Sequence, residues 1–400
     1  MCDGRCVLYF PSSILPFTYY IAFLMAGIYI HIPFCRQACH YCDFHFSTSL
    51  KIKNDFLAAL KKEIYLQRDY LETKNISTVY FGGGTPSVLF KEEILEIFTE
   101  LNKYFSIAHD AEITLEANPD DLSIEKIKEL SETPINRLSI GIQSFRDEDL
   151  GFLNRVHSAQ EAIECVINAK KAGFKNITID LIYGIQTLSN EQWKGNIEQA
   201  FALDVQHVSC YSLTVEPKTP LDSFIQKGKI KNIDPKKSAE QFQILMEKMK
   251  ENGFVHYEIS NFCKENYYSK HNSNYWKGEK YLGLGPSAHS FNKRSRQWNV
   301  KSNSEYISSL EKGNIPFDIE VLTESQRYNE YVLTSLRTIW GTDLNFVRDQ
   351  FPSKVISYLE EGIKVFLDQN LMTLSEGKIY LTDKGKLFAD KIAGDLFLVS

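Results

Sequence analysis

Three cysteines fall within eight residues near the start of the chain: Cys35, Cys39 and Cys42. Thiolates at this spacing, on a loop that leaves a predicted strand, can bind three irons of a four-iron cluster, whereas a fully liganded cluster needs four cysteines. One iron would then stay open for chemistry. The alternative is a structural zinc site completed by a histidine from residues 31–45, although zinc sites more often use paired CxxC motifs.

Polar or glycine residues lie at or near one end of every predicted strand in the N-terminal half of the chain. They are Gly82-Gly-Gly-Thr-Pro86, Glu116-Ala-Asn-Pro119, Gln143-Ser-Phe145, Asp180, Tyr211 and Thr214. Each of these alone could be an ordinary turn, helix cap or packed polar residue. Because parallel barrels carry their active sites at the carboxyl ends of the strands, their combination beside the cysteines favours one shared pocket.

Short β-rich segments alternate with amphipathic helical segments between Gly27 and Leu213. The predicted strands are 28–32, 78–81, 112–116, 137–142, 176–182 and 207–213, and the predicted helices are 54–72, 91–105, 124–131, 159–172 and 191–203. This alternation predicts an α/β fold with parallel strands and right-handed crossovers. Six units are too few for an eight-unit barrel, so an open or partial barrel is expected.

The rest of the chain divides less regularly. We expect a helix over 235–252, a strand over 254–259 and an irregular, aromatic-rich stretch over 261–298. The last segment reads as helices, a strand pair near 371–381 and a helix over 382–393, which is a winged-helix pattern. It lacks a basic recognition helix, which favours a lid or docking module over DNA binding. The predicted units are a non-native or extraneous N-terminal extension (1–24), the barrel (25–230), a barrel extension that carries the His271 motif (231–310) and a mostly helical C-terminal domain (311–400).

The composition limits the class of protein. The 400 residues are 43% hydrophobic and 24% charged, as in ordinary soluble proteins. With 45 basic and 51 acidic residues, the net charge of -6 gives no support to nucleic-acid or anionic-membrane binding. Eight unevenly spaced cysteines do not make a secreted disulfide scaffold. We therefore expect a cytoplasmic protein.

The first 24 residues stand apart from this pattern. Val7–Ile30 contains no charged residue, but Pro11 and Pro16 would break a membrane-spanning helix. The segment also lacks the basic start of a secretory signal. We expect that Met25 is the true start and that residues 1–24 are extraneous. A membrane-touching extension and a signal peptide are the alternatives.

The cysteine motif followed by Gly82-Gly-Gly-Thr-Pro86 resembles the radical S-adenosylmethionine (SAM) proteins. The resemblance implies a partial (β/α)6 barrel in which the amino and carboxylate groups of SAM chelate the open iron. It also implies a reductant such as flavodoxin or ferredoxin, whose electron passes through the cluster and cleaves SAM to methionine and a 5′-deoxyadenosyl radical. Exposed amides at the glycine turn would suit the methionyl end of SAM.

Within that superfamily the chain is similar to the oxygen-independent coproporphyrinogen III oxidase group, from about Ala26 to the C-terminus. The resemblance places the SAM pocket on Tyr29, Tyr41, Gly83, Gly84, Thr85, Glu116, Gln143, Arg155, Asp180 and, least securely, Thr214. It implies that Arg155 pairs with the SAM carboxylate, that Asp180 or Glu116 accepts ribose hydroxyls, and that Tyr41 packs near the adenine.

One departure points to a subgroup. The oxidases are expected to have a fourth cysteine where this chain has Phe44, and a long N-terminal segment that this chain lacks. Instead, His271-Asn272-Ser-Asn-Tyr275-Trp276 resembles a signature of the haem chaperones of the HemW type, which bind haem and pass it to acceptor proteins. The resemblance implies haem as a further ligand, with His271 as the candidate iron ligand and Tyr275 and Trp276 as stacking partners.

Several alternatives stay open at this point. The His271 segment could be a packed loop whose histidine only forms hydrogen bonds, with His256 and His289 as fallback haem ligands. The protein could also be a radical enzyme that decarboxylates coproporphyrinogen III, or a winged-helix regulator with an iron–sulfur sensor. For a chaperone, the implied partners are haem, a reductant and an acceptor protein, which could be membrane-associated, and no nucleic acid.

Overall fold

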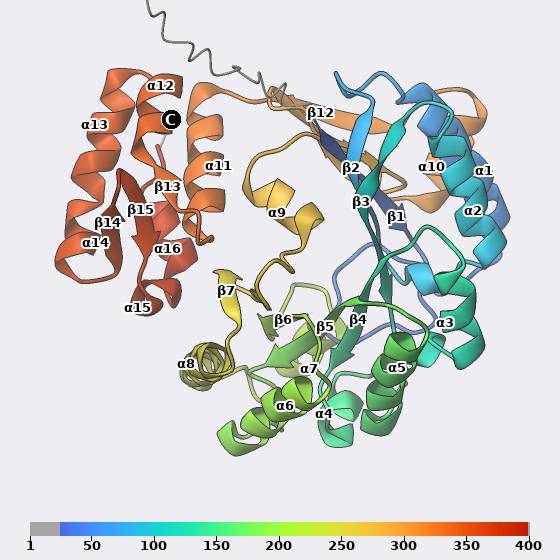
Figure 1. Ribbon diagram of the computed structural model, residues 1–400, viewed down its shortest axis with the longest axis horizontal. Coiled ribbons are helices and arrows are strands. Elements are labelled where there is room, and N and C mark those ends of the chain that lie inside the picture. Colours follow the sequence, from blue (N-terminus) through green and yellow to red (C-terminus); the bar gives the residue numbers. More distant parts are fainter. Residues whose placement is uncertain (1–24, 399–400) are drawn as a thin grey trace, which may run out of the picture.

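A curved twelve-stranded sheet forms the body of the computed structural model, which describes residues 25–398 (Figure 1). Its strand order is β12-β11-β10-β9-β1-β2-β3-β4-β5-β6-β8-β7. The predicted extension, 1–24, lies outside the described residues. Among residues 25–398, no helix is long and apolar enough to cross a membrane.

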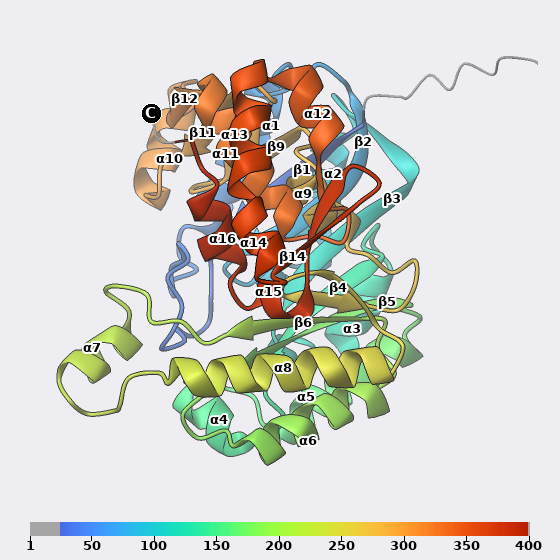
Figure 2. The same cartoon turned by 90° about the vertical axis from the view of Figure 1, so that its left-hand side faces the viewer.

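Six parallel strands make the centre of this sheet, which confirms the predicted partial barrel. They are β1 (Ala26–Ile32), β2 (Asn75–Gly83), β3 (Ser106–Ala117), β4 (Arg137–Gln143), β5 (Asn176–Tyr183) and β6 (His207–Ser212). The helices α1 (Lys53–Leu66), α2 (Lys91–Leu101), α3 (Ile124–Ser131), α5 (Ala159–Lys171), α6 (Asn190–Ala202) and α8 (Pro235–Glu251) cover its outer face (Figures 1 and 2). Short helices, α4 (Asp147–Phe152) and α7 (Pro220–Gln226), lie in the connections.

Alternation along each strand separates an apolar outer face from a polar inner face. In β1, Ile28, Ile30 and Ile32 are fully buried under the helices, whereas Tyr29 and His31 alternate with them and turn to the concave side. The barrel therefore has its core outside the strands and keeps its interior for polar side chains.

Both edges of the parallel sheet carry further strands, and the sequence analysis missed most of them. Beyond β1 lie β9 (Tyr281–Leu284), β10 (His289–Phe291), β11 (Ser295–Asn299) and β12 (Phe317–Val321), and beyond β6 lie β8 (Asn261–Cys263) and β7 (Val255–Glu258). The stretch 261–298, expected to be irregular, thus contains four strands and the helix α9 (Lys270–Trp276). Strands of three to five residues are too short for a period-two pattern to stand out.

The C-terminal domain has its own hydrophobic core, which begins at Tyr328. Helices α11 (Glu324–Leu336), α12 (Leu344–Gln350), α13 (Ser353–Gly362) and α14 (Lys364–Asp368) surround a small sheet of β13 (Thr342–Asp343), β15 (Lys378–Leu381) and β14 (Met372–Ser375). The predicted final helix is two pieces, α15 (Asp383–Lys386) and α16 (Ala389–Asp395). β12 pairs with β11, so residues 317–321 belong to the large sheet although the sequence placed them in the C-terminal segment.

A short antiparallel contact joins this domain to the body. Ile259 N donates to Arg337 O (3.1 Å), and Ile339 N donates to Tyr257 O (3.0 Å). The Arg337 guanidinium also pairs with Glu258 at 3.0 Å. The domain is therefore fixed against the end of β7, and α9 lies between it and the concave face of the sheet (Figure 1).

A buried carboxylate on α1 anchors the extra strands beyond β1. Glu63 is fully buried and accepts hydrogen bonds from Gly285 N (2.7 Å), Asn299 Nδ2 (2.6 Å) and Tyr306 Oη (2.6 Å). Tyr306 lies on α10 (Asn303–Glu311). One side chain thus ties the β9–β10 turn, β11 and α10 to the barrel, while burial raises the pKa of Glu63 to about 7 against these stabilising donors.

We expect Glu63→Ala to destabilise the protein by about 3 kcal/mol, because it leaves three buried donors without an acceptor. Urea denaturation would measure this, with the exposed Glu198→Ala as control. The raised pKa also predicts a pH dependence. The contribution of Glu63 is greatest below its ordinary pKa of 4.5 and falls as the pH rises to about 7. The difference in unfolding free energy between the wild type and Glu63→Gln should shrink over that interval, and a constant difference would contradict it.

Candidate functional site

The cysteine loop, residues 33–47, leaves the carboxyl end of β1 and is closed at its base. Cys35 N donates to Ser47 O (3.0 Å), and an isolated parallel bridge pairs Phe34 with Ser47. Phe34 is fully buried, and its ring packs edge-on against Phe56 at 5.4 Å. The base of the loop is therefore part of the core, while the cysteines above it stay partly exposed.

The middle of the loop is held by the segment that precedes Arg155. His40 N donates to Leu153 O (3.1 Å), and Asn154 Nδ2 donates to Ala38 O (2.7 Å). Asn154 has a left-handed φ of 60°. These contacts bring the loop after β1 and the loop after β4 together, 116 residues apart in the chain.

Two of the three thiols of the loop have polar neighbours from segments that follow other strands. Thr85 Oγ1 lies 3.3 Å from Cys35 Sγ, and Arg155 Nη1 lies 3.4 Å from Cys39 Sγ. Burial raises the pKa of Cys35 to about 11 and that of Cys42 to about 12, so a bound metal would have to displace their protons. The remaining cysteines of the described chain, Cys165, Cys210 and Cys263, are buried on other elements.

The thiol arrangement fits a cluster better than a single ion. Within residues 25–398, no three His, Cys, Asp or Glu side chains converge closely enough to hold one metal ion. A zinc ion would need such convergence. The three thiolates of a four-iron cluster each bind a different iron, so they do not need to converge on one point. Cys35, Cys39 and Cys42, on one partly exposed loop, are therefore the residues that would hold the cluster.

The glycine turn after β2 packs directly on the base of the cysteine loop. Gly83 has a φ of 104°, and a Cβ there would lie 2.6 Å from the His31 ring. A Cβ on Gly84 would lie 2.5 Å from Phe34 O. Only glycine fits at these two positions, because any side chain would separate β2 from the loop.

The amides of this turn are not free, contrary to our expectation that they face the methionyl end of SAM. Gly83 N donates to Glu116 Oε2 (3.2 Å), Gly84 N to Ile32 O (2.9 Å) and Thr85 N to Phe34 O (2.6 Å). The close packing of the turn on β1 consumes these donors. The turn therefore sets the shape of the site and positions the Thr85 hydroxyl.

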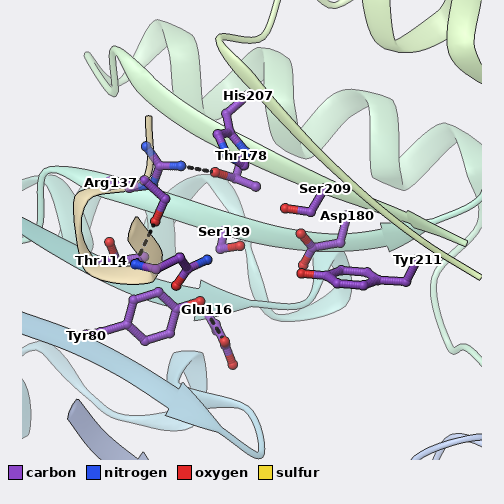
Figure 3. Close-up of a pocket in the computed structure, with 12 residues that line it drawn as sticks. Tyr80, Thr114, Glu116, Arg137, Ser139, Thr178, Asp180, His207, Ser209 and Tyr211 are labelled. Atoms are coloured by element: carbon purple, nitrogen blue, oxygen red, sulfur yellow. Dashed lines mark hydrogen bonds between the residues drawn. The ribbon is translucent and has the colours of Figure 1, made fainter. Parts of the chain in front are cut away.

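Two predicted carboxylates face the interior from neighbouring strands. Glu116 accepts from Tyr80 Oη (2.7 Å), and Asp180 lies beside Ser209 and Tyr211 (Figure 3). Burial raises the pKa of each carboxyl to about 7, and the charge of Asp180 raises that of Glu116 further. Near neutral pH each carboxyl is therefore partly protonated, and its ionised form can accept a hydrogen bond from a hydroxyl.

A small cavity of about 50 Å³ continues inward from these carboxylates (Figure 3). Arg137 lines it and donates to Thr178 Oγ1 (2.6 Å). Thr114 Oγ1 and His207 Nδ1 are buried there without a hydrogen-bond partner among the described residues. This volume has room for ordered water but not for an adenosyl group, so a large ligand would lie above it.

Arg155 is the centre of the polar contacts beside Cys39. Its Nη2 donates to Asn118 Oδ1 and to Gly141 O, each at 2.7 Å, and Asn118 Nδ2 donates to Thr85 Oγ1 (3.1 Å). The Arg155 guanidinium, the Cys39 thiol and the Thr85 hydroxyl are thus one connected set. Tyr41 lies beside Arg155, and its pKa is raised by burial.

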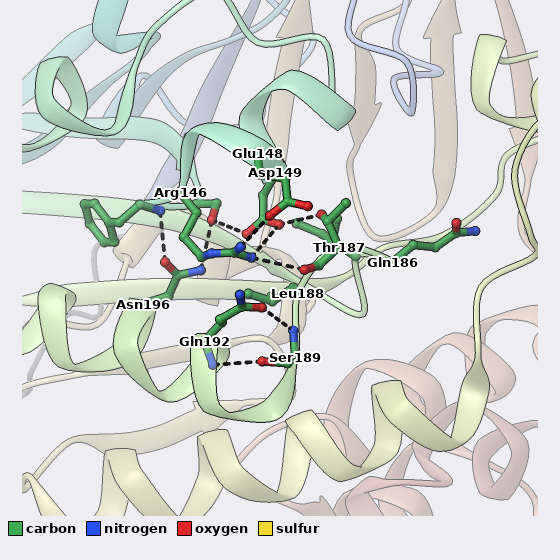
Figure 4. Close-up of polar contacts among 12 residues, drawn as sticks. Arg146, Glu148, Asp149, Gln186, Thr187, Leu188, Ser189, Gln192 and Asn196 are labelled. Atoms are coloured by element: carbon green, nitrogen blue, oxygen red, sulfur yellow. Dashed lines mark hydrogen bonds and ion pairs between the residues drawn. The ribbon is translucent and has the colours of Figure 1, made fainter.

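A buried network shapes the loop that carries Gln143 and Arg155 (Figure 4). Asp149 is fully buried and accepts from Ser144 Oγ (2.8 Å), Arg146 Nη1 (3.0 Å) and Thr187 Oγ1 (2.5 Å). Gln143, just before this network, has a φ of 70°. The left-handed backbone at Gln143 is stabilised because the hydrogen bonds of Asp149 fix the segment that follows it.

The other predicted SAM residues, Tyr29, Gln143 and Thr214, differ in their burial and contacts. Tyr29 is on the inner face of β1, with its hydroxyl 3.2 Å from His31 Nδ1. Gln143 is buried beside Gly141. Thr214 follows β6 and is exposed, and no described side chain forms a hydrogen bond with it. The structure therefore brings all predicted SAM residues except Thr214 into contact or close packing around the cysteine loop and the inner face of the sheet.

The predicted haem motif, expected to be a loop, is the short helix α9, whose buried residues are His271 and Ser273. His271 is 1% exposed; its Nδ1 lies 2.8 Å from Thr78 Oγ1 and its Nε2 lies 2.7 Å from Tyr275 Oη. Its ring stacks on Tyr80 at 5.0 Å, and burial lowers its pKa to about 3. Both nitrogens are occupied, so His271 could bind iron only if α9 moved.

The rest of this motif has other neighbours. Asn272 lines the cavity beside Asp180. Trp276 faces the C-terminal domain, with the Arg337 guanidinium 5.3 Å from its ring centre and a buried indole N–H that lacks a partner in the described chain. The motif thus joins the barrel interior to the C-terminal domain.

Several interior residues were missed by the sequence analysis. They are Tyr80, Asn118, Arg137, Ser139, Ser209 and Tyr211, of which Asn118 and Tyr211 were noted without a role. Alternation on the strands could have found most of them, because Tyr80 and Gly82, Thr114 and Glu116, or Ser209 and Tyr211 are two residues apart.

Comparisons with known proteins agree with this architecture. Residues 29–200 match the radical SAM superfamily, and residues 322–388 match the HemN C-terminal domain. A solved structure of coproporphyrinogen III oxidase (HemN) from Escherichia coli superimposes with a TM-score of 0.80 over 93% of this chain and 90% of that chain. At 23% identity, this likeness shows the fold alone.

The curated relatives are closer in sequence. Heme chaperone HemW of Bacillus subtilis is 35% identical over 92% of this chain and 98% of the relative. Heme chaperone HemW of Mycobacterium tuberculosis (H37Rv) is 31% identical over 92% and 94%. The mitochondrial radical S-adenosyl methionine domain-containing protein 1 of Danio rerio is 32% identical over 66% of this chain and 60% of the relative.

We expect Cys39→Ala to abolish cluster assembly, because one of three thiolates at the partly exposed loop is lost. Iron and sulfide content and the broad iron–sulfur absorbance after anaerobic reconstitution would measure this. Cys165→Ala, which changes a buried cysteine on α5, is the matched control and should assemble a full cluster. A full cluster in Cys39→Ala would contradict the assignment.

Proposed function

Because the chain belongs to the HemW family of radical SAM proteins, we propose that it is a haem chaperone, which binds haem and passes it to an acceptor protein. The observation that supports this most strongly is the identity of 35% across nearly the whole of this chain and of a heme chaperone. Phe44, at 67% exposure where the oxidase pattern has a cysteine, agrees with this choice.

The proposal includes a four-iron cluster on Cys35, Cys39 and Cys42 with SAM on the open iron. When bound, these groups supply an electron-transfer centre and a source of a carbon radical. The residues of the chain would hold and orient them. The Arg155 guanidinium, whose Nη1 lies 3.4 Å from Cys39 Sγ, would pair with the SAM carboxylate. Glu116 and Asp180, which line the inner cavity, would accept the ribose hydroxyls.

We expect Arg155→Ala to weaken SAM binding by roughly ten- to a hundred-fold, since it removes a charge-assisted hydrogen bond worth about 1.5–3 kcal/mol. Equilibrium dialysis of the cluster-loaded protein would measure this. Arg155→Lys keeps the positive charge but loses the planar guanidinium, so its SAM affinity should lie between those of the wild type and Arg155→Ala. Iron and sulfide content checks that the cluster is intact, and unchanged affinity in Arg155→Ala would remove Arg155 from the pocket.

The proposed function predicts haem binding without oxidase activity. We expect a Soret change that saturates near one haem per chain, and restoration of a haem-depleted acceptor when the loaded protein is added. Coproporphyrinogen III, with SAM and a reductant under anaerobic conditions, should yield no protoporphyrinogen IX. Absence of haem binding would overturn the chaperone proposal, whereas product formation would favour the oxidase alternative.

A further inference from the structure

The stretch from the end of α7 into the start of α8 is basic in a chain that is acidic as a whole. Residues 226–237 contain five lysines and one acidic residue, whereas the whole chain has a net charge of -6. The single acid, Asp234, accepts from Lys236 N (2.9 Å) and so caps α8. The Lys237 ammonium donates to two main-chain carbonyl oxygens at 2.9 and 3.1 Å. The positive charge of the other four lysines is therefore left without a use inside the protein.

These four lysines are exposed, and none of them forms an ion pair with another residue of 25–398. They are Lys227, Lys229, Lys231 and Lys236. Figure 2 shows that α7 and the loops on either side of it project from the body of the protein. Several unpaired cations on one projecting segment produce a positive potential that attracts an anionic partner over about 10 Å at 0.1 M salt.

The helix α7 packs directly against the loop that would hold the cluster. Leu221 N donates to His40 O (2.9 Å), and the ring of Phe224 meets the His40 ring edge-on at 5.1 Å. His40 lies between Cys39 and Cys42 in the sequence. The surface formed by α7 and residues 226–237, here called the α7 surface, therefore adjoins the cluster site, and it contains none of the predicted SAM residues.

We propose that the α7 surface is the docking site for a small acidic redox protein that reduces the cluster. The inference rests on the proposed function, which places a cluster on the cysteine loop. The partner gives up one electron and the cluster takes it up, so no bond is made or broken and no further reactant is needed. Electron transfer slows steeply with distance, which requires the partner to dock beside this loop. Charge complementarity speeds such an encounter, and redox complexes use small interfaces, as a short helix and a loop provide.

The test compares two variants that lose the same amount of positive charge at different places. The α7 variant changes all four exposed lysines of residues 226–237 to Gln. The control changes four exposed lysines on other elements to Gln: Lys128, Lys175, Lys312 and Lys354. Each cluster-loaded protein is mixed anaerobically with reduced flavodoxin, a small acidic flavoprotein, and cluster reduction is followed by stopped-flow absorbance.

We expect the second-order rate constant of cluster reduction to fall about tenfold in the α7 variant at low salt, because electrostatic attraction no longer speeds the encounter. The difference should disappear at about 0.5 M salt, where the charges are screened. The control variant should react like the wild type. Dithionite should reduce the cluster of every variant to the same extent, which checks that the cluster is intact.

A binding measurement on the cluster-free proteins separates docking from the cluster. Oxidised flavodoxin, titrated calorimetrically, should bind the wild type and the control alike and the α7 variant several-fold more weakly. If the wild type assembles no cluster or binds no haem, the proposed function fails, while this titration still tests the α7 surface.

Three results would overturn the docking site. One is equal reduction rates and equal affinity in the α7 variant and the control. Another is a wild type that flavodoxin neither binds nor reduces. The third is an α7 variant that keeps its reaction with flavodoxin but loses binding to phosphatidylcholine vesicles with about one quarter phosphatidylglycerol, since the segment would then contact an anionic membrane.

Discussion

The close contact between two backbones, the glycine turn after β2 and the base of the cysteine loop after β1, is the constraint on which the site depends. Gly84 approaches Phe34 so nearly that a methyl group would lie 2.5 Å from its carbonyl oxygen. This contact fixes the Thr85 hydroxyl at the Cys35 thiol. Thr85 in turn accepts a hydrogen bond from the Asn118 amide, and Asn118 accepts one from the Arg155 guanidinium. The positions of residues that follow four different strands therefore depend on the packing of these two turns against each other.

Much of the site was predictable because its chemistry is local in sequence. The three cysteines occur together, and the polar residues that follow the strands had to gather at one edge once the strands were parallel. Glu116 and Asp180 lie near this edge, as that reasoning predicts, whereas Arg155, which only the family resemblance pointed to, lies beside Cys39. The amides of the glycine turn were not predicted correctly, because their hydrogen bonds to Ile32 and Phe34 depend on how tightly two turns pack.

The parts that could not be predicted depend on contacts between distant segments. Nothing in the His271 sequence shows that Thr78, on β2, would take one of its nitrogens. Whether a histidine beside aromatic residues is a ligand or a buried hydrogen-bonding residue is decided by tertiary packing. Similarly, Glu63 gives no sign in a helical sequence that it will anchor strands more than two hundred residues later.

The extra strands at both edges have a consequence for the shape of the barrel. β1 has its second edge occupied by β9 and β6 has its second edge occupied by β8, so the first and last strands of the six cannot pair with each other. The ring is held open by main-chain hydrogen bonds and not by bulky side chains. Substitutions inside the barrel can therefore tune its polarity, but its aperture would change only if a whole strand were displaced.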